Sequence, residues 1–193
     1  MISSMSRFVS RFLLKYRIID RGETDIYEYG FEIIISSLVG FILVIAIGMI
    51  YDIFLYALTY FAIFTFIRRT TGGYHAETYF KCNLVFSIVS FTTMGMTCVS
   101  YENELYSFPL HLLLLITAIV VIYRYAPVES PNKPLDEAQR KSNHAKGVIY
   151  VVALAIGSCI MYCYALELSI LIAYTLFMVS ILLMVVVIKE GRD

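Results

Sequence analysis

Two residue types that together support thiol chemistry occur in one polar stretch, residues 68–82, with the sequence RRTTGGYHAETYFKC. His75 stands seven residues before Cys82, in a chain with only three histidines and four cysteines. A cysteine protease needs both types, because a thiolate attacks the carbonyl and an imidazolium then protonates the leaving amine. Cys82 is therefore a candidate nucleophile and His75 a candidate base.

The spacing of these two residues constrains the local fold. Two helical turns place both side chains on one face, but about 10.5 Å apart along a straight helix. No hydrogen bond spans that distance, so we expect the chain to bend between them, with Cys82 in the opening turn of a helix. There the helix dipole stabilises a thiolate, and the cations Arg68, Arg69 and Lys81 add to the positive field.

The same stretch has other interpretations. Gly72 and Gly73 permit positive φ, so their N–H groups suit a developing oxyanion, but such pairs are also ordinary turn residues. A histidine in a polar connection is often structural. His75, Glu77 and Cys82 would form only an incomplete set of metal ligands. We expect no metal and no cofactor.

The composition is that of a membrane protein. Of 193 residues, 60% are hydrophobic and 16% are charged, which is too apolar for an ordinary soluble domain. The formal net charge is zero, and no stretch interleaves basic and aromatic residues on a polar surface as nucleic-acid binders do, so no nucleic-acid partner is expected. The cysteines Cys98, Cys159 and Cys163 lie in apolar runs, where a thiol behaves as a small hydrophobe.

Six apolar segments are candidate spanning helices, each of which needs roughly 20 residues. They cover residues 31–51, 53–67, 84–101, 108–123, 147–166 and 168–188. The second is short: at ~1.5 Å per residue it reaches about 22 Å, less than the ~30 Å hydrocarbon thickness, which draws Arg68 to the interface. The sequence predicts an all-α integral membrane protein with one membrane-embedded domain over residues 1–193.

The basic residues predict the orientation. All 15 Lys and Arg residues lie before the first segment, in the connections 68–83 and 124–146, or at the C-terminus. The other three connections carry only acidic charge. By the positive-inside rule, both termini and the 68–83 connection face the cytoplasm.

The N-terminal segment, residues 1–22, has the pattern of an amphipathic helix. Its cations and its aromatic rings form neighbouring helical stripes: Arg7, Arg11 and Lys15, and Phe8, Phe12 and Tyr16. This predicts a helix in the cytoplasmic interface, with its cations toward lipid phosphates. The same cations also serve as a simple topology signal.

The connection 124–146 contains three of the four prolines. Proline favours extended backbone in its first half. Asp136 and Glu137 follow Pro134, which favours the start of a short helix that runs to about His144. His144 lies on the same predicted side of the membrane as His75 and is the rival base.

In these motifs the chain resembles the accessory gene regulator B family. The resemblance rests on RRTTGGYHAETYFKC before an apolar segment and on the later YAPVESPNKPL, and it covers essentially the whole chain. Members of this family are membrane-embedded cysteine endopeptidases of Gram-positive bacteria that process quorum-sensing propeptides. The resemblance places the nucleophile at Cys82, the base at His75, and supporting positions at Arg68 and Gly73.

The resemblance also implies a substrate and a location. The substrate is a propeptide with an amphipathic helix and an acidic C-terminal tail, cut at the cytoplasmic face of the cell membrane. Cys82 would attack the carbonyl at the start of the tail. The thioester would then be captured by a Cys or Ser side chain of the peptide, giving a thiolactone or a lactone. A homodimer is compatible with the family.

A non-enzymatic membrane protein, either a small transporter or a scaffold, is the alternative. An ion-coupled transporter is expected to carry ionisable residues within its spans. Here the candidate spans contain little beyond Glu32 at an edge and His111. This scarcity favours the enzyme.

Overall fold

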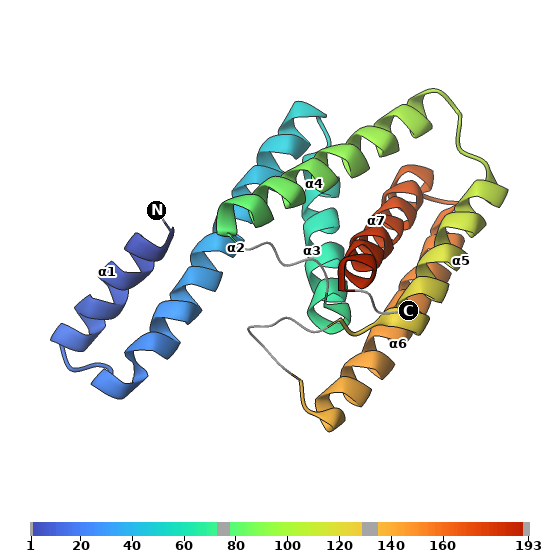
Figure 1. Cartoon of the computed structure of the whole chain (residues 1–193). Helices are drawn as coiled ribbons and strands as arrows, with labels where there is room; N and C mark the ends of the chain where they lie inside the picture. The colour runs from blue at the N-terminus through green and yellow to red at the C-terminus, as the bar shows by residue number, and fades with distance from the viewer. Residues whose placement is uncertain (1, 73–77, 129–134, 191–193) are drawn as a thin grey trace. The chain divides into compact units, whose positions relative to one another are not determined.

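The computed structural model describes residues 2–72, 78–128 and 135–190, and these are helical throughout except for turns and connections (Figure 1). The helices are α1 (Ile2–Lys15), α2 (Thr24–Ile50), α3 (Phe54–Thr71), α4 (Tyr79–Glu102), α5 (Phe108–Tyr125), α6 (Glu137–Met161) and α7 (Leu166–Glu190), with a 3₁₀ turn η1 (Arg21–Glu23) before α2. The described residues contain no strand, only one isolated bridge between Gly72 and Val128. The predicted all-α class is confirmed.

Within the described residues, five helices are long and apolar enough to cross a membrane: Arg21–Ile50, Tyr79–Glu102, Phe108–Tyr125, Glu137–Met161 and Leu166–Lys189. The remaining long helix, α3, ends in two arginines and two threonines, Arg68 to Thr71, which lower its mean hydropathy. The multi-pass helical character is therefore confirmed. The sixth span and the cytoplasmic termini stay predictions.

Some boundaries differ from the prediction. Helix α2 begins at Thr24 rather than at residue 31, and α4 begins at Tyr79 rather than at residue 84. The difference is larger at α6. The short helix expected to end near His144 is the beginning of α6, which runs without a break to Met161. Asp136 caps this helix, because its carboxylate accepts a hydrogen bond of 2.7 Å from the Gln139 N–H. Gly147 does not interrupt it. A Cβ there would lie 3.4 Å from Cγ2 of Thr71, an ordinary van der Waals contact, so α6 passes the end of α3 at packing distance.

The chain forms two compact units, which are described separately. The first comprises Met1–Leu43 and Ala76–Ser87, and the second comprises Val44–His75 and Ile88–Asp193. Helices α2 and α4 each contribute to both units.

In the first unit, α1 folds back beside the start of α2 (Figure 1). Two of its serines face inward: Ser6 and Ser10 are fully buried, and Ser6 Oγ donates a hydrogen bond of 2.6 Å to the Glu28 carbonyl. Its aromatic rings face outward, since Phe8 is 73% exposed and Phe12 is 50% exposed. Small side chains let two helices approach closely, which leaves the rings available to lipid. The interfacial location of α1 stays a prediction.

In the second unit, α7 is the central helix. It contacts α3, α5 and α6, and 72% of its most apolar stretch is buried, against 28% or less for the other candidate spans. Ile170, Leu171, Leu176 and Leu183 have no exposed surface. A helix that is apolar on all sides is typical of such a buried position.

Candidate functional site

Cys82 lies in the first unit, in the opening turn of α4, where it is the fourth residue. Thr78 caps this turn: its Oγ1 accepts from the Lys81 N–H at 3.3 Å, and its carbonyl accepts from the Cys82 N–H at 3.0 Å. The cysteine is half-buried. The predicted placement of Cys82 at the start of a helix is confirmed, and the positive end of the helix dipole lies beside its thiol.

A polar seam holds the start of α4 against α2. Tyr79 Oη donates a hydrogen bond of 2.9 Å to Oε2 of Glu32, and Ser36 Oγ donates one of 3.4 Å to Oδ1 of Asn83. Partners spaced four residues apart on both helices set the register of the turn that carries Cys82. Sequence reasoning missed this seam, because Glu32 and Tyr79 are 47 residues apart.

Arg68 lies in the second unit, in the last turn of α3. It is half-buried, and its guanidinium carbon lies 5.6 Å from the ring centroid of Phe64. The carbonyl of Arg68 accepts a hydrogen bond of 3.0 Å from the Gly72 N–H, which closes the helix. A planar guanidinium stacked on a ring is a fixed cation.

The other predicted residues fall partly outside the described chain. His75 and Gly73 lie outside the described residues, as does Glu77 of the metal alternative. Cys82 and Arg68 belong to different units. The pairing of His75 with Cys82 and the bend between them therefore stay predictions.

The structure brings the two motifs of the sequence analysis together. The Val128 N–H, in the proline-rich connection, donates a hydrogen bond of 3.0 Å to the Thr71 carbonyl, next to the bridge between Gly72 and Val128. The rival base, His144, is half-buried, with Nδ1 2.7 Å from the Ala126 carbonyl oxygen. The end of α3, the connection and the start of α6 thus form one junction.

His111 is a buried structural residue rather than a second candidate base. It has no exposed surface; Oη of Tyr106 lies 3.0 Å from its Nδ1, and Oγ of Ser158 lies 3.4 Å from its Nε2. Ser158 also donates a hydrogen bond of 3.0 Å to the Ser169 carbonyl. This cluster ties α5, α6 and α7 together. Buried polar side chains that have hydrogen-bond partners help to specify how helices pack against one another.

The remaining cysteines do not compete with Cys82. Cys98 and Cys159 are half-buried within α4 and α6. Cys163 is exposed in the turn after α6, although the sequence placed it inside an apolar run. Neither the turn after α6 nor the interior of a helix provides a capped helix N-terminus like the one in which Cys82 lies.

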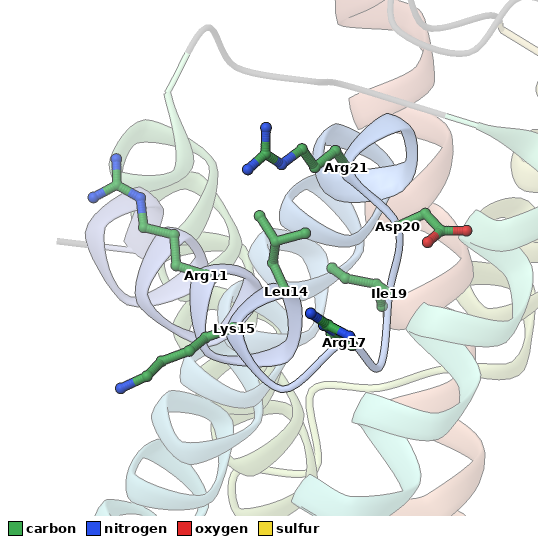
Figure 2. Close-up of a pocket in the computed structure, with 7 residues that line it drawn as sticks. All are labelled: Arg11, Leu14, Lys15, Arg17, Ile19, Asp20 and Arg21. Atoms are coloured by element: carbon green, nitrogen blue, oxygen red, sulfur yellow. The ribbon is translucent and has the colours of Figure 1, made fainter.

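A cationic pocket of about 570 Å³ lies in the first unit where α1 turns into η1. Figure 2 shows its lining: Arg11, Leu14, Lys15, Arg17, Ile19, Asp20 and Arg21. Arg17 has a positive φ of 56°, and the Ile18 N–H donates to the Leu13 carbonyl at 3.0 Å, the closing bond of a helix C-cap. Four cations against one carboxylate make this pocket suited to anionic groups.

Comparison with known proteins identifies the family. The family model described as accessory gene regulator B matches residues 6–187. An AgrB-like protein of Clostridium perfringens (strain SM101) is 25% identical over 180 residues, 91% of this chain and 80% of the relative. The accessory gene regulator protein B of Staphylococcus intermedius is 26% identical over 68% of each chain.

A third relative is the protein FsrB of Enterococcus faecalis, which is 24% identical over 71% of this chain and 56% of its own length. No solved structure matches the chain. The family match covers both motifs of the junction and Cys82 in the opening turn of α4. This chain therefore belongs to the accessory gene regulator B family, membrane proteins linked to the maturation of quorum-sensing peptides.

Proposed function

We propose that this protein is a cysteine endopeptidase that removes the C-terminal tail of a quorum-sensing propeptide through a thioester at Cys82. The observation that carries the proposal is the position of Cys82, half-buried in the capped opening turn of α4. Family membership supports the substrate class, because the family is linked to peptide maturation. A thiol at a helix N-terminus is suited to act as a thiolate nucleophile.

In the proposed mechanism, His75 takes the thiol proton and the Cys82 thiolate attacks the carbonyl that precedes the tail. A tetrahedral oxyanion forms and collapses. The C–N bond breaks, and the imidazolium of His75 protonates the leaving amine. Backbone N–H groups near Gly73 and the cation Arg68 are the proposed partners of the oxyanion or of the acidic tail.

The second half of the reaction releases a ring. A Cys or Ser side chain of the peptide attacks the thioester carbonyl, and the Cys82 thiolate leaves, which gives a thiolactone or a lactone. Water would instead hydrolyse the thioester, so the reaction needs a site from which water is excluded. A cysteine that opens an apolar helix, α4, meets this need if the helix enters the bilayer at that end.

The alternative of an ion-coupled transporter has less support. Glu32 has a hydrogen-bond partner in Tyr79, and His111 has Tyr106 and Ser158. Both ionisable residues that the sequence places in candidate spans are thus engaged in packing, whereas coupling requires groups that exchange protons or ions.

The direct test is to capture the acyl-enzyme. Purified protein in liposomes is incubated with a propeptide encoded beside its gene and quenched in acid. Intact-mass and peptide mass spectrometry should find a covalent adduct, equal in mass to the propeptide minus its tail, on Cys82. Tail release with no adduct on Cys82, or with the adduct on another residue, would contradict the thioester.

We also propose that α3 crosses the membrane as the sixth span, so that both termini and the site face the cytoplasm. Single cysteines, Ser142→Cys and Glu104→Cys, are introduced at exposed positions of a cysteine-free chain and labelled with an impermeant maleimide. Ser142→Cys should be labelled only in inverted vesicles and Glu104→Cys only in right-side-out vesicles. If α3 does not cross and the N-terminus stays inside, both results are reversed.

A further inference from the structure

We propose that His144 is a positioning residue: with the connection segment Ala126 to Val128, it holds the end of α3 in the conformation from which the catalytic stretch begins. This inference rests on the proposed function. His144 then has a role other than that of the base, and the proline-rich connection contributes to the reaction by positioning the end of α3.

The connection segment is bound to the end of α3 by its backbone. Val128 donates its N–H to the Thr71 carbonyl at 3.0 Å, and Ala126 is extended, with φ −79° and ψ 150°. Both side chains are buried, at 4% exposed for Val128 and 7% for Ala126. A buried backbone bond in a connection holds its two segments in a fixed register.

Gly72 makes this contact possible. Its φ of 70° is a conformation that L side chains rarely adopt, and a Cβ there would collide with the carbonyl oxygen of Val128. The two backbones therefore touch where any side chain would separate them. Gly72 is also the last described residue before the stretch that contains His75, so this contact fixes the backbone at the end of α3.

His144 fastens the other side of the segment. Its Nδ1 lies 2.7 Å from the Ala126 carbonyl oxygen. Since a carbonyl oxygen only accepts, Nδ1 carries the proton and donates. The ring also lies 5.8 Å, centroid to centroid, from that of Tyr123, near the end of α5.

The start of α6 completes the junction. Gly147 is almost one turn after His144, so both lie on one face of the helix. A Cβ at Gly147 would lie 3.4 Å from Thr71 and 3.6 Å from Thr70. One face of α6 thus approaches the end of α3 directly through Gly147 and holds the connection through His144.

This arrangement requires that the side chain at position 144 has an N–H donor where Nδ1 of the histidine lies. Asparagine supplies such a donor, because its Nδ2 is as many bonds from the backbone as Nδ1 of histidine. Glutamine is one bond longer. Neither amide can act as a base, so the His144→Asn variant separates positioning from proton transfer.

The test measures tail cleavage by His144→Asn, His144→Gln and His144→Ala proteins in liposomes, with Ser142→Ala, at an exposed position of the same helix, as the matched control. We expect kcat of the Ala and Gln variants to fall by about tenfold or more with KM little changed, because misplaced catalytic groups lose rate steeply. The Asn variant should stay within about threefold of the wild type, since the positioning donor is restored.

A second readout does not depend on activity. Hydrogen exchange of the Val128 amide, followed by mass spectrometry, should accelerate in His144→Ala and return toward the wild-type rate in His144→Asn. If the wild-type protein cleaves no propeptide but this exchange pattern appears, the proposed function fails and the holding role of His144 stands.

Two outcomes would overturn the inference. Equal inactivity of the Asn and Ala variants would make His144 the base, as an acid–base role cannot be rescued by an amide. The second outcome is that neither the cleavage rate nor the exchange rate of the Val128 amide changes in any of the three variants. The hydrogen bond from His144 to Ala126 would then have no effect on the reaction.

Discussion

Cys82→Ala protein in liposomes is expected to insert normally and to release no tail from the propeptide. In the proposed mechanism this residue supplies the attacking sulfur, and removing a catalytic nucleophile costs a rate factor of about 10⁶ in a well-studied protease. The measurement is the amount of free tail by mass spectrometry, per mole of inserted protein. Cys82→Ser is less informative, because the hydroxyl is itself a weak nucleophile.

The matched control for this experiment lies on the same helix. Cys98 is also half-buried in α4, but it is four turns further along, away from the capped end. Cys98→Ala should cleave at close to the wild-type rate. Continued tail release by the Cys82→Ala protein would exclude Cys82 as the nucleophile and would return the chain to the non-enzymatic alternative.

The His75→Ala variant is expected to lose activity by about 10² to 10⁴-fold, the usual contribution of a positioned acid or base. Alkylation of Cys82 by a thiol reagent should also slow, because in the proposed mechanism the imidazolium of His75 is the partner of the thiolate. Added imidazole should restore part of the cleavage in His75→Ala, since a small base can occupy the space that the side chain leaves. The measurement is initial cleavage rate against imidazole concentration.

The comparison with His144 makes this prediction decisive. If His75→Ala stays active while His144→Asn does not, the base is His144. The roles of the two histidines would then be exchanged. If His75→Ala is inactive and His144→Asn is active, the assignment of base and positioning residue stands as proposed.

The presence and approximate positions of the helices could be predicted from the sequence. Long apolar runs bounded by charge indicated α2, α4, α5 and α7, although α2 and α4 begin seven and five residues before the predicted spans 31–51 and 84–101. The start of α4 just before Cys82 also agreed, because Thr78 is a good N-cap and its hydroxyl accepts from the Lys81 N–H. These features depend on neighbours within one or two turns, which a linear pattern displays.

Other features could not be predicted from the sequence. The stripe of arginine, lysine and rings on α1 indicated an amphipathic helix, but not that Ser6 and Ser10 would face α2. The prolines indicated an extended connection, but not that Val128 would bind Thr71. Each such contact joins residues that are tens of positions apart, and composition says nothing about which faces meet.

The amino-acid sequence alone determined the membrane class, the helix positions, and a cysteine at the start of a helix with a histidine before it, since hydropathy, charge and capping are local properties. The folded structure was needed to show that α7 is the central helix, that Tyr79 pairs with Glu32, and that Gly72, Val128 and His144 form one junction. The reason is physical: these contacts depend on close approach between backbones and side chains of distant segments, which folding alone brings within hydrogen-bond reach.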